Sequence, residues 1–419
     1  MLGLILVGLI LLCIILGQPL YVIVGLISGY CFKFFGEEEI RNIVSDIFYA
    51  GDKEILLAIP LFVLAGNLMT QGSISKRLIR LASALTAPIP SGMAIAAVLS
   101  CAIFAAISGS SPVTLIAVGT ILYPALREKN YSKKLSVGML SAGGTLGIII
   151  PPSIPMIIFA IMAGVSVTKL FLAGIGPGIL LTSLLIGYAI IAGPGFEQRG
   201  KWDPKEVRGA LKSGILSLLM PVVILGGIYS GFFTATESAG IAVVYAFIVE
   251  AFIHRELKLK ELPKIFSDTA EMLGTIFIIL VLAVSLNKFM TYQQIPQQLV
   301  ESLGTYITGK VSFLIVVNIL LLLVGCVMDI MSAILILSPI LTPMAESFGI
   351  SPIHFGILMI VNLEIGYLTP PVGINLFVAS GIFEEPIGEV IKSILPLILV
   401  LLVGLLLITF VPQISLFLL

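Results

Sequence analysis

Apolar runs about as long as a lipid bilayer is thick follow one another through the whole sequence, and they constrain the fold more than any other feature. They include LGLILVGLILLCIILG at 2–17, MAIAAVLSCAIFAAISG at 93–109 and LPLILVLLVGLLLITFV at 395–411. A membrane-spanning helix needs about 20 mostly apolar residues. Only 11% of the residues are charged, whereas soluble domains carry about 25%. The sequence therefore predicts an all-α polytopic membrane protein.

Charge and residue types exclude several classes of function. The formal net charge is zero at pH 7, which argues against binding to nucleic acid. The two histidines lie at segment ends and the four cysteines have no C-x-x-C spacing, so we expect no cofactor and no metal site beyond a simple coupling ion. An intramembrane enzyme would need two carboxylates close enough to share a proton. Asp329 and Glu364 are the candidates, but they flank a break that suits a cation, so we do not expect an enzyme.

The chain contains an internal duplication. Two stretches, LMTQGSISKRL at 68–78 and FMTYQQIPQQL at 289–299, match at an offset of 221 residues. Further along, matching residues recur at an offset of 219. These pairs are Ile121/Ile340, Leu122/Leu341, Pro124/Pro343, Gly147/Gly366, Pro151/Pro370, Pro152/Pro371, Ala160/Ala379 and Pro177/Pro396. Ordered self-similarity of this kind indicates a repeated architecture.

Each copy predicts the same succession of elements. An apolar stretch too long for one crossing is interrupted in its middle, by SGSSP at 108–112 in one copy and by GCVMDIMS at 325–332 in the other. We interpret these stretches, 92–126 and 311–343, as re-entrant helical hairpins. The Pro-Pro segments 135–165 and 354–380 follow, and each is predicted to be a broken helix because proline removes a backbone donor and clashes with the preceding turn.

The duplication divides the chain into scaffold and transport parts. The expected parts are N-terminal scaffold helices with a connector at 1–91, transport repeat one at 92–193, further scaffold helices with a connector at 194–310, and transport repeat two at 311–419.

The distribution of positive charge gives the orientation. Lys and Arg residues number 23, and 17 of them fall in the loops 71–90, 126–134, 194–213, 254–266 and 381–392. The positive-inside rule places these loops in the cytoplasm. Five crossings then separate the two hairpins, so the repeats are inverted. Inverted repeats with broken helices are typical of secondary transporters.

The breaks and hairpin tips supply groups that bind small ions. Free backbone carbonyls and hydroxyls suit a hard cation such as sodium, and half-helix N-termini suit an anionic group. Asp329 is the single acidic residue in either hairpin core, and a charge there is a functional candidate. The alternative is packing, with prolines that form kinks and serines that bond one turn back. The candidates are Ser108, Ser110, Ser111, Gly147, Ile150 and Pro152 in repeat one, and Gly325, Asp329, Gly366, Thr369 and Pro371 in repeat two.

Four further residues, Asn362, Glu364, Pro151 and Pro370, are expected near the substrate. Asn362 and Glu364 directly precede the second break. Glu364 could bind a cation, take up a proton or form a structural pair, and the residues alone leave this open. A separate motif, Thr234-Ala235-Thr236-Glu237, fits a capping box at the start of a helix and predicts a structural role.

Five stretches together resemble a known family. They are AIPLFVLAGNLM (58–69), GSSPVT (109–114), GTLGIIIPPSIPMIIF (144–159), FFTATESA (232–239) and NLEIGYLTPPVGINLFV (362–378). In this order they resemble the large membrane subunit of the tripartite ATP-independent periplasmic (TRAP) transporters, over nearly the whole chain.

The resemblance implies an elevator-type, sodium-coupled symporter in the bacterial cytoplasmic (inner) membrane. An extracytoplasmic binding protein would deliver an organic acid such as a C4-dicarboxylate or sialic acid. A small four-helix membrane subunit would be a separate chain, because residue 1 already begins the large-subunit pattern. The resemblance places one sodium site on Ser108, Gly147, Ile150 and Pro152, and the other on Gly325, Asp329, Gly366, Thr369 and Pro371.

Two alternatives stay open beside this hypothesis. One is a stand-alone dicarboxylate carrier of related inverted-repeat fold, coupled to another cation or to protons. The other is a structural scaffold, which leaves the duplicated breaks unexplained. No arginine or lysine lies inside either hairpin or break. An anionic substrate would therefore be held by helix N-termini and bound sodium, or weakly, with the binding protein providing the selectivity.

Overall fold

The computed structural model describes residues 2–35, 44–45, 48–49, 51–194, 200, 202–303 and 309–419, and every regular element among them is a helix. Within these ranges eight helices are long and apolar enough to cross a membrane, and a ninth span is counted if the bent pair 133–149 and 154–163 forms one. The prediction of an all-α polytopic membrane protein is confirmed.

The helices of the two repeats follow the register of the duplication. Repeat one consists of α6 (Gly92–Ser108), α7 (Ser111–Glu128), α8 (Lys133–Gly144), α9 (Leu146–Ile149), α10 (Ile154–Ala163) and α11 (Val167–Ala192). Repeat two consists of α16 (Lys310–Val327), α17 (Ile330–Ser347), α18 (Pro352–Tyr367), α19 (Ile374–Phe383) and α20 (Ile387–Phe410), and α21 (Gln413–Leu416) follows. The starts of α7 and α17, Ser111 and Ile330, are 219 residues apart. Both interruptions and both Pro-Pro breaks therefore lie where the sequence predicts them.

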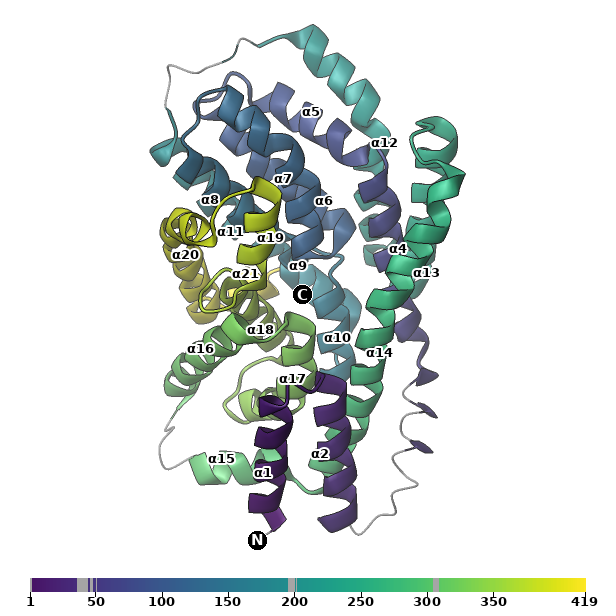
Figure 1. Ribbon diagram of the computed structural model, residues 1–419, viewed down its shortest axis with the longest axis vertical. Coiled ribbons are helices and arrows are strands. Elements are labelled where there is room, and N and C mark those ends of the chain that lie inside the picture. The colour runs from purple at the N-terminus through teal and green to yellow at the C-terminus, as the bar shows by residue number, and fades with distance from the viewer. Residues whose placement is uncertain are drawn as a thin grey trace.

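The two repeats interlock. The second half of each broken helix packs against the hairpin of the other repeat, with α10 on α17 and α19 on α7. The last long helix of each repeat also packs against the other repeat: α20 contacts α8, and α11 contacts α18. In Figure 1, α10 of repeat one reaches down to the level of α18 and α17, and yellow α19 of repeat two lies up near α7. Each hairpin is therefore held by elements of both repeats.

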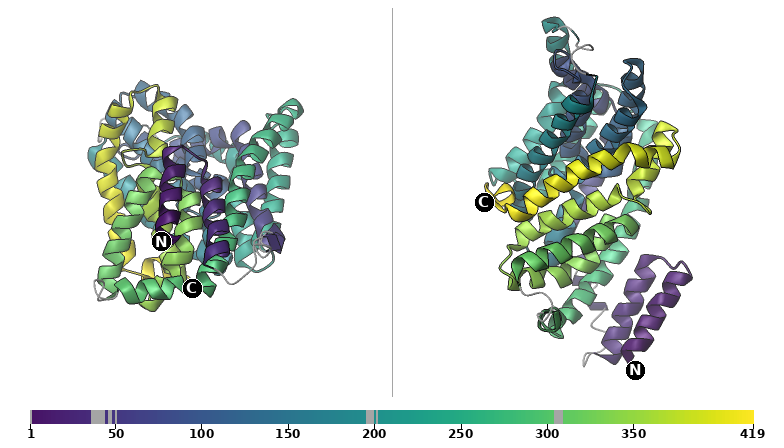
Figure 2. Two further views of the ribbon diagram at one scale, coloured as in Figure 1. Left: turned by 60° about the horizontal axis from the view of Figure 1, so that its bottom comes forward. Right: turned by 90° about the vertical axis from the view of Figure 1, so that its left-hand side faces the viewer.

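The other long helices flank the repeats. They are α1 (Leu2–Ile15), α2 (Leu20–Phe34), α4 (Ala58–Gln71), α12 (Pro204–Tyr229), α13 (Ala235–Ile248) and α14 (Leu262–Tyr292). Helix α13 packs along α4, and α14 packs against α2, α4 and α17. Figure 2 shows α1 and α2, in purple, as a pair at the edge of the molecule. Helix α14 thus joins the flanking helices to the hairpin of repeat two.

The connectors before the two hairpins contain short helices, which the sequence analysis did not distinguish from polar loops. These are α5 (Ile74–Thr86) and α15 (Ile295–Leu303). In α5, Ile74, Leu78 and Leu81 are buried and recur at helical spacing. This spacing favours an amphipathic helix even where the segment is rich in polar residues. The two helices begin 221 residues apart, the same offset as the sequence match in this region.

The capping box at the start of α13 is confirmed. The Thr234 hydroxyl accepts the Glu237 backbone N–H at 3.1 Å, and Glu237 Oε2 accepts the Thr234 backbone N–H at 2.8 Å. The pair satisfies two N–H groups that the helix itself leaves unpaired. It fixes the point at which the chain enters α13.

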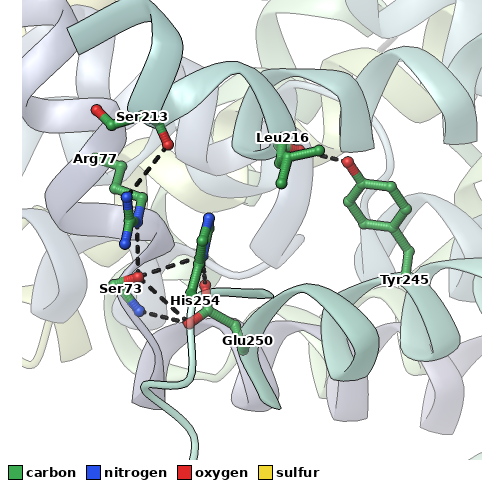
Figure 3. A network of polar contacts seen from close by, with 7 residues as sticks. All are labelled: Ser73, Arg77, Ser213, Leu216, Tyr245, Glu250 and His254. Atoms are coloured by element: carbon green, nitrogen blue, oxygen red, sulfur yellow. Dashed lines mark hydrogen bonds and ion pairs between the residues drawn. The ribbon is translucent and has the colours of Figure 1, made fainter. Parts of the chain in front are cut away.

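A buried polar network holds the elbow between α4 and α5 (Figure 3). Glu250 is fully buried in η3 (Val249–Ile253), the π-helical turn that ends α13. Its Oε2 accepts the Ser73 backbone N–H at 2.9 Å, and its Oε1 lies 3.1 Å from His254 Nδ1. Arg77 Nε donates to Ser73 Oγ at 2.9 Å. A Cβ at Gly72 would lie 2.2 Å from Glu250 Oε2, so the absence of a side chain there makes room for the carboxylate.

Candidate functional site

The tip of hairpin one lies directly on the first break. Between α6 and α7 the chain turns at Gly109, whose φ of +59° favours glycine. The Gly109 carbonyl accepts the Ile154 backbone N–H at 3.5 Å. A Cβ at Gly109 would lie 3.0 Å from the Pro152 carbonyl oxygen. The tip and the Pro-Pro break are therefore in backbone contact.

Hydroxyls and carbonyls concentrate at this junction. A Cβ at Gly147 would lie 2.5 Å from the Ser110 carbonyl oxygen and 2.7 Å from Thr114 Oγ1. Ser108 Oγ lies 2.7 Å from Thr114 Oγ1, and Thr114 Oγ1 donates to the Ser110 carbonyl at 2.9 Å. The structure thus brings Ser108, Ser110 and Gly147 of the predicted first site together. The sequence analysis missed Thr114, although its place one helical turn after Ser110 on the same face could have indicated it.

Two other members of the first predicted set have side chains with partners outside the junction. Ile150 is the C-cap residue of α9, and its side chain faces α11, where a Cβ at Gly178 would lie 2.8 Å from Ile150 Cγ1; the carbonyl of Ile150 stays a predicted ion ligand. Ser111 donates to Glu364 Oε1 at 2.5 Å. This serine therefore connects hairpin one to repeat two.

The tip of hairpin two lies on the second break in a similar way. The Cys326 carbonyl accepts the backbone N–H groups of Val372 and Gly373 at 3.2 and 3.1 Å. Gly325 and Gly366 are in close contact, since a Cβ at Gly366 would lie 2.5 Å from the Gly325 Cα. Both junctions depend on a glycine at equivalent positions of the broken helices, 147 and 366. A side chain at either position would separate tip and break.

The polar groups of the second junction also have structural partners. Asp329 caps α17 by accepting the Ser332 backbone N–H at 3.0 Å, and Thr369 Oγ1 donates to the Ile365 carbonyl at 2.8 Å. This is the packing alternative that the sequence left open. The second break is also more open than the first, because Pro371 is exposed whereas Pro151 and Pro152 are buried. The ion-binding roles of both junctions stay predictions.

A cavity of about 340 Å³ lies between the two hairpin tips. Ser110 and Ser111 of tip one, Asp329 of tip two, and Met272 and Ile276 of α14 contribute to its lining, together with residues of both broken helices. Its size lies in the range of about 300–1,000 Å³ that is typical of small-molecule sites. The described lining residues include no lysine or arginine.

The four residues expected near the substrate are not among the lining residues of this cavity. Glu364 lies behind the lining residue Ser111, to which it is hydrogen-bonded. Asn362 lies elsewhere: its Nδ2 donates to Asn318 Oδ1 at 2.9 Å, and Thr409 Oγ1 bonds to the same oxygen at 3.3 Å. It therefore connects α18 to α16 and α20, and its place beside a substrate stays a prediction, as do those of Pro151 and Pro370.

A third polar cluster contains two residues that the sequence singled out, Ser111 and Glu364, and one that it did not, Asn375. Asn375 Nδ2 donates to Ser111 Oγ at 2.6 Å and to Glu364 Oε1 at 3.1 Å. The three side chains come from α19, α7 and α18, so the cluster spans both repeats. A polar residue in the apolar run just after the second break was the available signal for Asn375.

Comparisons with known proteins place the chain in a family. Residues 7–414 match the family described as "Tripartite ATP-independent periplasmic transporter, DctM component". The "C4-dicarboxylate TRAP transporter large permease protein DctM" of Pseudomonas aeruginosa is 40% identical over 394 residues, which cover 94% of this chain and 92% of that protein. The "Isethionate TRAP transporter permease protein DctMQ" of Oleidesulfovibrio alaskensis is 36% identical over 96% of this chain and 64% of its own length.

A solved structure has a similar fold. The crystal structure of the Alcanivorax borkumensis YdaH transporter superposes with a TM-score of 0.61 and 17% sequence identity, over 88% of this chain and 87% of that one. At this identity the likeness concerns the fold alone.

Proposed function

This chain belongs to the DctM family of TRAP transporter components and is a multi-pass protein of the inner membrane, and from that premise we propose that it carries an organic acid across the membrane together with sodium ions. The observation that carries the proposal is the pair of tip–break junctions on either side of one cavity. Each junction presents backbone carbonyls at a broken helix, which are the groups that coordinate sodium in transporters of this general plan.

The proposed substrate is a small dicarboxylate. Ser111 and Ile330, the first residues of α7 and α17, both line the cavity. The first turn of a helix presents unpaired N–H groups and a partial positive charge. Two such N-termini at one cavity suit a molecule with two carboxylates, provided that the sodium ion proposed beside Asp329 offsets this carboxylate, which already accepts the Ser332 N–H at the start of α17. This agrees with the substrate that the name of the Pseudomonas aeruginosa relative gives, and it favours a C4-dicarboxylate over sialic acid.

The proposed ion sites are the two junctions. Ser108, Gly147, Ile150 and Pro152 would form one site, with Thr114 as an added neighbour of Ser108 and Ser110 as a carbonyl donor. Gly325, Asp329, Gly366, Thr369 and Pro371 would form the other. Sodium bound at both junctions would add positive charge next to the cavity, so the ions and the anion would bind in a mutually supporting way.

The proposed partners are a small membrane subunit and an extracytoplasmic binding protein. The relative named DctMQ is longer than the stretch that this chain matches, which is 64% of it; this supports a companion membrane segment. The interlocked repeats would move as one body against α4, α12, α13 and α14, as in an elevator. Such a movement would expose the cavity to each side of the membrane in turn.

The experiment that tests the proposal is uptake into proteoliposomes. The chain is co-purified with its small subunit, and labelled succinate, fumarate, malate, sialic acid and isethionate are offered with and without an inward sodium gradient and the proposed binding protein. We expect dicarboxylate uptake that requires both sodium and the binding protein. Uptake without the binding protein would instead support the stand-alone carrier, and uptake that ignores sodium would contradict the proposed coupling.

A further inference from the structure

A second cavity, of about 420 Å³, lies between hairpin one and the elbow that joins α4 to α5. Its volume is within the range of about 300–1,000 Å³ that is typical of small-molecule sites. Pro112 lines the central cavity and its neighbour Val113 lines this one, so both cavities adjoin the first turn of α7. The elbow begins the connector 71–90, which the positive-inside rule places on the cytoplasmic side.

The lining of this elbow cavity suits an anion. Its described residues include one lysine, Lys76, and no aspartate or glutamate. In the part of the chain that the structure describes, no carboxylate forms an ion pair with Lys76. The polar residues of the lining are Asn67, Thr70, Gln71, Ser75, Lys76 and Thr120.

The Ser75 hydroxyl is buried at this cavity without a partner. Only 5% of Ser75 is exposed, and its side chain makes no hydrogen bond to any residue that the structure describes. Buried polar groups nearly always have a hydrogen-bond partner, so this hydroxyl is available to a ligand. Ser75 and Lys76 are also the second and third residues of α5, and the first turn of a helix presents unpaired N–H groups and a partial positive charge.

The acidic group of the elbow, Glu250, is not among the residues that line the cavity. Its carboxylate is fully buried and bonded to the Ser73 backbone N–H and to His254. Arg77, which donates to the Ser73 hydroxyl, brings a positive charge that offsets the negative charge of Glu250. Lys76 therefore adds a positive charge that no acidic group of the elbow balances.

The duplication provides a comparison on the opposite side of the molecule. A cavity of about 300 Å³ lies between α15 and α17, the counterparts of α5 and α7. Figure 1 shows α5 and α15 at opposite ends of the molecule. Gln297 is the counterpart of Lys76 at the offset of 221, and the described lining of this cavity includes Glu301 and no lysine or arginine. Of the two cavities, the cationic one thus lies on the predicted cytoplasmic side.

We propose that the elbow cavity is a second carboxylate site, which binds the transported organic acid on its way to the cytoplasm. A carboxylate accepts hydrogen bonds from Lys76 and Ser75, and Asn67 and Gln71 offer amide groups to the remainder of the molecule. Lys76 supplies the positive charge that sodium supplies at the central cavity, so the elbow site holds the acid without sodium. For the identity of the acid, the inference rests on the proposed function.

Calorimetric titration of succinate into the purified complex in sodium-free buffer tests the proposal. Without sodium the central cavity lacks its proposed ions, so the elbow site dominates the binding. We expect the wild type to bind succinate, with a Kd at least about tenfold higher in Lys76→Gln. Ser75→Ala should raise the Kd less, because a neutral donor forms a weaker hydrogen bond than a charged one. No binding without sodium, or the same Kd in Lys76→Gln as in the wild type, would overturn the proposal.

The matched control is Lys264→Gln. Lys264 is also an exposed lysine at the third position of its helix, α14, but it does not line the elbow cavity. Because both lysines are exposed, both variants should fold. The Kd of Lys264→Gln should equal that of the wild type. A loss as large as that in Lys76→Gln would show a general effect of surface charge and would overturn the site.

Inorganic phosphate and phosphatidylglycerol in mixed micelles serve as competing ligands. We expect neither to displace succinate at an equal concentration. Displacement that depends on Lys76 would mean that the cavity serves a phosphate or a lipid headgroup, and the carboxylate assignment would be wrong. Failure of the proposed function is a separate result. Binding that depends on Lys76 supports the site even where sodium drives no uptake, whereas sodium-driven uptake without this binding overturns the site alone.

Discussion

Glu250 and Glu364 are the two acidic side chains that the described part of the chain buries completely, and they are held in different ways. Glu250 has partners on both oxygens, with the Ser73 backbone N–H on one and His254 on the other. Glu364 has two neutral donors on one oxygen and nothing on the other. The first lies among the flanking helices and the second between the moving tips and breaks of the proposed mechanism.

The difference teaches how a buried carboxylate can be interpreted. Burial alone separates neither role, since both residues have no exposed surface. The partners separate them: Glu250, with hydrogen bonds on both oxygens, strengthens a joint between helices, whereas one oxygen of Glu364 has no hydrogen-bond partner. The predictions below test whether this contrast holds.

Removal of the Glu250 carboxylate should have the largest effect on stability. Glu250→Ala removes the acceptor of the Ser73 backbone N–H and one of the two polar contacts of His254 Nδ1, which also lies 3.4 Å from Ser73 Oγ. An orphaned buried polar group costs about 1–3 kcal/mol, so the total loss should be about 3 kcal/mol. The measurement is the melting temperature of the purified complex. The control is Glu346→Ala, at an exposed position near the end of α17. Equal melting temperatures for the two variants would contradict the stabilising role of Glu250.

The conservative glutamine variants should separate the two residues. Glu250→Gln weakens charge-assisted hydrogen bonds to neutral ones and should lower stability by about 1–2 kcal/mol at neutral pH. Glu364→Gln should cost less than that, because a glutamine keeps one oxygen to accept the hydrogen bonds from Ser111 and Asn375. Thermal melting of the two variants side by side checks this. Equal losses would mean that the two sets of partners contribute alike, and the contrast would fail.

A partly buried carboxylate in a loop should show the smallest effect. Glu385, in the loop between α19 and α20, pairs with Lys133 and accepts the Tyr123 hydroxyl at 2.8 Å. The hydrogen bond from Lys133, followed by that from Tyr123, holds the pKa of this carboxyl below its ordinary value. Its stabilising effect is therefore present above the ordinary carboxyl pKa and lost as the pH falls.

The matching variant is Glu385→Gln. It should lower stability by less than about 1 kcal/mol at neutral pH, because Lys133 is partly exposed. The difference from the wild type should disappear on acidification, when the native carboxyl is protonated. A difference that grows at low pH would reverse the assigned sign.

The duplication explains which features the sequence could predict. Spans, hairpin tips, Pro-Pro breaks and the equivalent glycines at 147 and 366 all have a counterpart in the other copy, so two weak signals support each other. Hydrophobic length and proline chemistry then suffice to place the helices. The two tip–break junctions could be assembled from sequence because each lies within one repeat.

The Glu364 cluster could not be assembled in that way. Ser111 and Glu364 are 253 residues apart and belong to different repeats. Their equivalents, Ile330 and Thr145, do not reproduce the pair, and the Thr145 hydroxyl bonds to the Ala142 carbonyl of its own helix at 2.6 Å. The pairing of Glu250 with Ser73, 177 residues away, has the same character. Contacts of this kind depend on how the repeats and flanking helices interlock, which no local pattern contains.

The sodium dependence of dicarboxylate uptake by two glycine variants tests the central claim most directly. A Cβ at Gly147 or Gly366 would overlap the tip of its own hairpin, whereas nothing lies within 4 Å of a Cβ at Gly187 in α11. Gly147→Ala and Gly366→Ala should each raise the sodium concentration for half-maximal uptake at least about tenfold, a loss of about 1.4 kcal/mol in sodium binding, and Gly187→Ala should match the wild type. An unchanged sodium dependence in both junction variants would contradict the account.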